Sequence, residues 1–357
     1  MAVVLQSSIS VGAKSIGPRH PVFIIAEAGV NHNGDARLAR ELILRAKRAG
    51  ADCVKFQTFS AERVASQAAP KARYQLKATM SGESQLTMLK ALELDRKVYR
   101  QLLEAAKKEG IIFLSTPYDA EDVDFLDELG VPAFKLASIH VVEHAFLRHV
   151  AKKQKPVILS TGMATLKETR EAVAIFKKAG NKKLILLQCT TDYPSAIKEA
   201  NLRAMQTISS TFKLMTGYSD HTPGFAAACV AAALGARVVE KHFTVDKNLP
   251  GPDQAASLDT AEFTQYVRMI RDAEMALGSA EKNPTPSEQK NAVSMRRSAV
   301  AAKDIKAGTI LRPEHLALKR PGLGFLGNRM GEILGKRALK NIRRETLITP
   351  DLIRRRD

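Results

Sequence analysis

The sequence of 357 residues has no apolar run that approaches the ~20 residues of a membrane-spanning helix. Its start, MAVVLQSSISVGAKS, lacks the basic beginning and long apolar stretch of a secretory signal. The only cysteines are Cys53, Cys189 and Cys229, an odd number at wide spacing. This pattern argues against a disulfide framework and a CxxC site, and it is typical of a reducing compartment. We therefore expect a cytoplasmic protein that does not enter a membrane.

Acidic residues are in short supply, since 37 Asp and Glu stand against 55 Lys and Arg, for a net charge of +18. The excess is greatest between Arg296 and Asp357, with 16 basic and 6 acidic residues. A basic tail can indicate nucleic-acid binding. This tail has one aromatic residue, Phe325, and no recognisable binding motif. We therefore expect the charge to attract a small anionic substrate, or to serve solubility, and we expect no nucleic-acid partner.

Apolar residues make up 45% of the chain and gather in eight short runs rich in β-branched side chains. These predicted strands are 22–29, 53–59, 111–117, 133–138, 157–162, 184–190, 214–221 and 238–244. Helical spacing, each time followed by glycine, occurs at 35–49, 95–109, 121–129, 165–179 and 223–234. This alternation predicts an α/β fold, and eight strands favour a closed (β/α)8 TIM barrel. The alternative is a doubly wound open sheet, but no GxGxxG follows the first strand.

The alternation of strands and helices stops after Leu277, so we expect a barrel domain at 1–278. Residues 279–295 are polar with two prolines and predict a linker. Residues 296–357 have short strand-like runs and glycine turns, and they predict a small, separate β-rich domain.

Polar side chains follow nearly every predicted strand, at the end where TIM barrels place their sites. The set includes Glu27, Lys55, Gln57, Thr116, Lys135, Ser138, Ser160, Tyr193, Ser219, His221, Glu240 and His242. Taken singly, such a lysine is more often a solvated charge, a histidine more often a hydrogen-bonded core residue, and a serine or threonine often a helix cap. Converging from eight strands, they favour a site for phosphate and carboxylate groups.

The last strand, VVEKHFT at 238–244, carries three side chains that are costly to bury without partners. Because neighbours in a strand alternate, Glu240 and His242 should face the site and Lys241 the helices. His221 ends the preceding strand, and two neutral imidazoles so placed can share a divalent metal with open positions. Two histidines by themselves do not establish a metal site.

Nine segments, in order, resemble signatures of the sialic acid synthase family: AEAGVNHNG, VKFQT, STP, FKLAS, ILSTGM, CTTDYP, GYSDHT, EKHFT and GPDQAASL. The stretches AAKDIKAGTIL and KRPGLG resemble the family's C-terminal antifreeze-like (SAF) domain, a β-clip fold similar to type III antifreeze protein. These enzymes condense phosphoenolpyruvate with an N-acylated hexosamine to a nine-carbon 2-keto acid and release phosphate. The resemblance runs from residue 20 to residue 350.

The resemblance implies a role for each matching residue. The divalent metal, usually Mn²⁺ with Mg²⁺ or Co²⁺ as alternatives, is expected on His221 and His242. Phosphoenolpyruvate is expected on Lys55, Thr116, Lys135, Ser138, Ser160 and Ser219, and the sugar on Gln57, Tyr193, Asp253 and Arg320. Arg320 is expected to reach the site of the other chain in a domain-swapped homodimer. Glu27 and Glu240 are the candidates for proton transfer, and the sequence does not choose between them.

Two positions depart from the family pattern. His140 stands where bacterial sialic acid synthases often have a carboxylate that touches sugar hydroxyls, and Thr191 stands where they often have asparagine. The sequence CTTxYP occurs often in relatives of the legionaminate type, which use 2,4-diacylamino-6-deoxy sugars. The main hypothesis is an N-acetylneuraminate synthase using N-acetylmannosamine, and the alternative is a legionaminate or pseudaminate synthase.

Three more distant hypotheses stay open. A lysine at a strand end can be a Schiff-base aldolase nucleophile, which would be Lys55 or Lys135 here. The barrel can also be a non-catalytic sugar-binding protein. Finally, a related barrel synthase can make an eight-carbon keto acid, although such an enzyme would not need the C-terminal domain.

Overall fold

The computed structural model describes residues 8–79 and 82–353. The chain forms two compact units that meet in sequence at Gly278 and Ser279. Residues 1–7 and 354–357 lie outside the described residues. The outer ends of the two predicted domains, and the first residues of the start that was predicted to lack a secretory signal, fall within these ranges.

The first unit is built on eight parallel strands. They are β3 (Phe23–Gly29), β4 (Cys53–Thr58), β5 (Ile112–Pro117), β6 (Phe134–Leu136), β7 (Val157–Ser160), β8 (Leu184–Cys189), β9 (Met215–Asp220) and β10 (Val238–His242). Their order is β5-β4-β3-β10-β9-β8-β7-β6, and the end strands β5 and β6 contact each other. The predicted TIM barrel is confirmed, and every barrel strand lies inside a predicted run.

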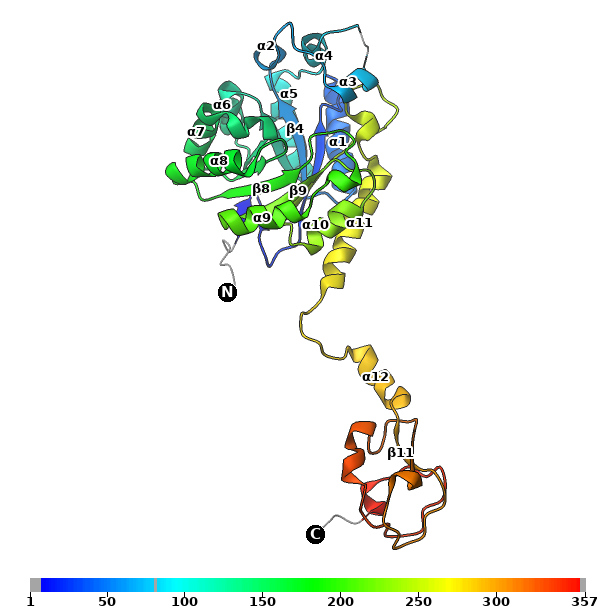
Figure 1. Ribbon diagram of the computed structural model, residues 1–357. Helices are drawn as coiled ribbons and strands as arrows, with labels where there is room; N and C mark the ends of the chain where they lie inside the picture. The colour runs from blue at the N-terminus through cyan, green and yellow to red at the C-terminus, as the bar shows by residue number, and fades with distance from the viewer. Residues whose placement is uncertain (1–7, 80–81, 354–357) are drawn as a thin grey trace. The chain divides into compact units, whose positions relative to one another are not determined.

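Helices cover the outside of the strands (Figure 1). They are α1 (Ala36–Arg48), α5 (Arg96–Glu109), α6 (Ala120–Leu129), α7 (His144–Lys152), α8 (Leu166–Lys178), α9 (Arg203–Phe212), α10 (Ala226–Ala233) and α11 (Thr260–Leu277). The sequence pattern did not predict α7, α9 and α11. The helix α9 was not predicted because it contains Thr, Ser, Ile and Phe, which have modest helix propensity.

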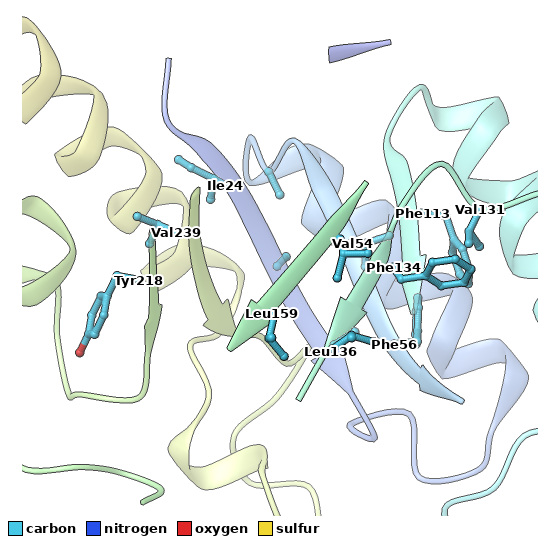
Figure 2. Close-up of a cluster of buried hydrophobic side chains, with 14 of the residues drawn as sticks. Ile24, Val54, Phe56, Phe113, Val131, Phe134, Leu136, Leu159, Tyr218 and Val239 are labelled. Atoms are coloured by element: carbon cyan, nitrogen blue, oxygen red, sulfur yellow. The ribbon is translucent and has the colours of Figure 1, made fainter. Parts of the chain in front are cut away.

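The apolar core has two layers because neighbouring residues of each strand face opposite sides of the sheet. Figure 2 shows outward residues such as Ile24, Val54 and Phe134, which pack between the strands and the helices. Inward residues such as Phe23 and Ile158 fill the barrel. A hairpin that the sequence pattern did not predict, β1 (Ile9–Val11) and β2 (Lys14–Ile16), packs against this inner layer.

A long connection between β4 and α5 carries three short helices that were also not predicted. They are α2 (Ala61–Val64), α3 (Arg73–Ala78) and α4 (Gln85–Ala91). Figure 1 shows them together at one end of the barrel unit. Since the connection follows the carboxyl end of β4, it lies at the end where the polar residues of the strands gather.

The second unit contains α12 (Pro286–Met295) and the antiparallel pair β11 (Ser298–Ala301) and β12 (Leu316–Lys319). The helix α12 forms inside the stretch expected to be a linker, because Pro286 occupies its first turn and Thr285 and Glu288 form a capping box. The small apolar core of this unit includes Ile305 and Ile348. In the described part of the chain, no helix is long and apolar enough to cross a membrane.

Candidate active site

A cavity of about 340 Å³ opens among the carboxyl ends of the barrel strands, and all eight strands or their following loops line it. The lining brings together the predicted residues Glu27, Lys55, Gln57, Thr116, Lys135, Ser138, Ser160, Tyr193, Ser219, His221, Glu240, His242 and Asp253. Arg320 is not in this lining. It lies in the second unit, where its Nε donates a hydrogen bond to the carbonyl oxygen of Met295.

Two lysines and two glutamates form a buried, charge-balanced cluster at the floor of the cavity. Lys55 Nζ lies 2.6 Å from Glu27 Oε2 and 3.8 Å from Glu240 Oε2. Lys135 Nζ lies 3.3 Å from Glu240 Oε1. Each lysine also donates to a hydroxyl, Lys55 to Thr116 Oγ1 at 3.0 Å and Lys135 to Ser160 Oγ at 2.9 Å. Such pairing offsets the large cost of removing four charges from water.

The surroundings push the pKa values of the two glutamates apart. Burial, together with nearby Glu240, raises the pKa of Glu27 above its usual value despite Lys55. Burial opposes ionisation of Glu240 too, but Lys135 and Lys55 bring its pKa below the usual value. Burial also lowers the pKa of Lys135, whereas Glu240 and Glu27 outweigh burial and raise the pKa of Lys55. Glu27 is thus the carboxyl group more easily protonated.

The wall between β6 and β8 carries hydroxyl groups. Ser138 Oγ and Thr191 Oγ1 lie 3.4 Å apart. Gly162 lies between them in the left-handed region at φ +34°, and a Cβ atom there would collide with both hydroxyls. On the neighbouring strand β9, Ser219 Oγ donates to Glu240 Oε1 at 3.1 Å. Hydroxyl donors beside two ammonium groups suit the oxygens of a phosphate or a carboxylate.

His221 and His242 face the same cavity, with ring centroids 5.5 Å apart. Burial lowers the pKa of His221 to about 4, and burial and His221 lower the pKa of His242 well below its usual value. Both imidazoles are therefore neutral near pH 7, the form that binds metals. His221 Nδ1 lies 2.6 Å from the carbonyl oxygen of Thr190, which leaves Nε2 as the acceptor.

A divalent metal fits these two histidines. His242 Nδ1 is buried without a hydrogen-bond partner, and it lies 3.8 Å from Asp253 Oδ2. Within the described residues, no group of three or more His, Cys, Asp and Glu side chains is arranged to hold a metal. The protein thus offers two neutral ligands, and water or substrate would fill the remaining positions.

The polar residues of β10 divide between the two faces of the strand, as expected. Glu240 and His242 line the cavity, whereas Lys241 points toward the helices. Lys241 Nζ lies 3.2 Å from Asp220 Oδ2 and donates to the carbonyl oxygen of Thr222. Asp220 in turn accepts from Tyr266 of α11 and from Thr222. The buried lysine therefore fixes the turn on both sides of His221.

The two departures from the family pattern have different surroundings. Thr191 lines the cavity, but His140 does not. The His140 ring is buried against Phe146, with centroids 4.3 Å apart, and its Nδ1 lies 2.7 Å from Glu143 Oε2. The apolar side chain of Ile139 faces the cavity in its neighbourhood.

The cavity also has residues that the sequence reasoning missed. Tyr118 donates to Gln57 Oε1 at 3.1 Å, and its position just after β5 was the same signal that identified the other residues. The connection between β4 and α5 contributes another part of the lining, which includes Tyr74, Gln75, Gln85 and Met88. No strand end marked these residues in the sequence.

Comparison with known proteins decides the family. Residues 42–282 match the model of the NeuB family, and residues 296–354 match the SAF domain. This chain belongs to the NeuB family. It is a nonulosonic acid synthase that condenses phosphoenolpyruvate, with a C-terminal SAF domain, and the resemblance described from the sequence is confirmed.

Relatives with different products are similar to this chain to different degrees. The N,N'-diacetyllegionaminic acid synthase of Campylobacter jejuni is 50% identical, over 91% of this chain and 98% of that protein. The human N-acetylneuraminate-9-phosphate synthase is 35% identical, over 95% and 94%. The crystal structure of an N-acetylneuraminic acid synthetase from Leptospira borgpetersenii, in complex with citrate, is similar with a TM-score of 0.71 and 36% identity. The match covers 80% of this chain and 95% of the Leptospira chain.

Proposed function

We propose that this nonulosonic acid synthase makes an N,N'-diacetyllegionaminate-type product from phosphoenolpyruvate and 2,4-diacetamido-2,4,6-trideoxymannose. The observation that carries the proposal is the 50% identity to a diacetyllegionaminic acid synthase, against 35% to the human N-acetylneuraminate-9-phosphate synthase. Thr191, in CTTDYP, lines the cavity and agrees with this assignment. The alternative from the sequence therefore replaces N-acetylmannosamine as the favoured acceptor.

The cavity wall supports the same choice of sugar. At the position where a carboxylate often touches sugar hydroxyls, His140 is buried away from the cavity. Ile139, Val30 and Met88 contribute apolar surface to the lining instead. A sugar with a 6-methyl group and two acetyl groups has more apolar surface to bury than N-acetylmannosamine, and apolar walls favour it.

Lys55 and Lys135 are the groups expected to hold phosphoenolpyruvate, with Ser138, Ser160 and Ser219 as hydroxyl donors. Their role is to position the substrate and to balance its negative charge while carbon 3 attacks the sugar aldehyde. Water then adds at carbon 2, and the hemiketal phosphate loses phosphate by C–O cleavage. A divalent metal on His221 and His242 would supply Lewis-acid polarisation of the aldehyde oxygen.

Glu27 is the better candidate for proton transfer. Burial raises the pKa of Glu27, which favours its protonated form, whereas Lys135 and Lys55 lower the pKa of Glu240 and favour its ionised form. Glu240 would then act by orienting the two lysines, which it contacts at 3.8 and 3.3 Å.

The acceptor is tested by phosphate release from phosphoenolpyruvate by metal-reloaded protein, with and without EDTA. Release is expected with 2,4-diacetamido-2,4,6-trideoxymannose at a kcat/KM at least about tenfold above that for N-acetylmannosamine. EDTA is expected to stop release. Preference for N-acetylmannosamine would instead make the protein a sialic acid synthase. If neither sugar supports phosphate release, the proposed acceptor is wrong and only the family assignment stands.

We also propose that the active form is a homodimer in which Arg320 of one chain completes the site of the other. Exposed apolar side chains follow three neighbouring strands at the mouth of the barrel, among them Ile139, Met163 and Ile197. Exposed apolar side chains on neighbouring loops favour a protein partner.

Mixing two inactive variants tests the dimer. Arg320→Ala and His242→Ala should each be inactive alone, but mixed dimers should recover part of the activity because one site keeps both residues. Arg343→Ala, in the same unit, is the control that should not lose activity. If subunits exchange and the mixture stays inactive, the shared site is wrong.

A further inference from the structure

The segment between β4 and α5, in its described residues 61–79 and 82–92, forms one wall of the cavity. Eight of its residues line the cavity, and Tyr74, Gln75 and Gln85 are the polar ones. Its other contributions are apolar, and Met88 and Leu92 pack with Val30 in a small cluster apart from the main core. The wall thus combines hydroxyl and amide groups with a dry patch.

Ion pairs join the α2 end of the segment to α6 and link separate parts of the segment to each other. Arg63 of α2 contacts Asp119 and reaches Asp122 Oδ1 at 2.9 Å, which joins α2 to the start of α6. Within the segment, Lys71 Nζ lies 2.8 Å from Glu83 Oε1 and Lys90 Nζ lies 2.7 Å from Glu62 Oε1. A wall held by such pairs is preorganised to contact a ligand.

Tyr74 joins this wall to the residues expected around the sugar. Its ring lies against Tyr193, with centroids 4.8 Å apart, and the Tyr193 ring in turn lies tilted against His221, with centroids 4.2 Å apart. Burial, with Asp253 and Tyr118 nearby, raises the pKa of Tyr74, so its hydroxyl keeps its proton at working pH. Gln85 Nε2 donates to Gln75 Oε1 at 3.3 Å, which orients the two amides beside each other.

We propose that the described residues of this segment, 61–79 and 82–92, form the subsite for the second acetamido group of the acceptor sugar. Tyr74 and Gln85 would hydrogen-bond its amide, and the patch of Val30, Met88 and Leu92 would take its methyl group. This inference rests on the proposed function. An acetamido group needs one donor, one acceptor and an apolar contact, and this wall supplies all three.

A selectivity ratio tests the subsite. The ratio is the kcat/KM for the diacetamido sugar divided by the kcat/KM for N-acetylmannosamine, which has a hydroxyl at carbon 4. Both values are measured on the same protein preparation, so the fraction of active enzyme cancels. Tyr74→Phe and Gln85→Ala should each lower this ratio by about fivefold or more, because each loses a hydrogen bond that only the first sugar makes. Met88→Ala should lower it by a similar factor.

Two exposed neighbours serve as matched controls. Gln67→Ala changes the same residue type in the same segment, and Leu76→Ala changes a side chain of α3; both are exposed and absent from the cavity lining. Both should keep the ratio within twofold of the unmodified protein, about 0.4 kcal/mol. If Tyr74→Phe, Gln85→Ala and Met88→Ala lower both activities in parallel, the subsite is wrong while the proposed function stands. If the unmodified protein does not prefer the diacetamido sugar, the proposed function fails first.

Discussion

Replacing His242 with alanine is expected to lower turnover at least about 100-fold while the protein stays folded. His242 faces the cavity beside His221, and burial keeps both imidazoles neutral. Removing one of the two proposed protein ligands should weaken metal binding and with it the polarisation of the sugar aldehyde. Thermal unfolding should change little, because the Nδ1 atom of His242 is buried without a hydrogen-bond partner and its loss breaks no such contact.

The measurement pairs phosphate release with metal content after dialysis, so that binding is read without relying on activity. His144→Ala is the matched control. The His144 side chain is 42% exposed, and its ion-pair partner is the surface residue Glu171 at 3.6 Å. Both readouts should be unchanged in the control. Full turnover with unchanged metal content in His242→Ala would refute the metal assignment.

The barrel and most of the site could be predicted from the sequence because both depend on local rules. A buried parallel strand is a continuous apolar run, so all eight were visible, from Phe23–Gly29 to Val238–His242. The fold then brings the carboxyl ends of the strands together, which is why residues as distant as Glu27 and Glu240 meet around Lys55.

The rest of the site depends on tertiary contacts. Tyr74 lines the cavity from a segment that ion pairs such as Arg63 with Asp122 join to α6, and no periodicity reveals such pairs. His140 is the opposite case. It stands at a position where relatives often have a side chain that touches the sugar, but here its ring is buried against Phe146. The direction of a side chain in a turn follows from packing, so the family pattern alone did not predict it.

Lys135→Met should lower kcat/KM for phosphoenolpyruvate by about 100-fold to 1000-fold. The free site holds two lysines against Glu27 and Glu240, and losing Lys135 leaves an uncompensated carboxylate where the substrate brings more negative charge. Lys178→Met, on the exposed end of α8, should keep full activity. Lys135→Arg should recover only part of the loss, because a planar guanidinium does not reproduce the short contact to Ser160 Oγ.

The same variant separates this electrostatic role from a Schiff-base aldolase. A Schiff base needs a neutral amine, and Glu240 and Glu27 raise the pKa of Lys55 while burial lowers that of Lys135, so Lys135 is the lysine that would serve. We expect pyruvate and borohydride to leave the unmodified protein active and its mass unchanged. Trapping that disappears in Lys135→Met, with activity that survives EDTA, would favour the aldolase. A Schiff base forms between an amine and a ketone, whereas the substrate is an enol phosphate and has no ketone. The ion-pair geometry around Glu240 therefore agrees better with a lysine that binds the negative charge of the substrate.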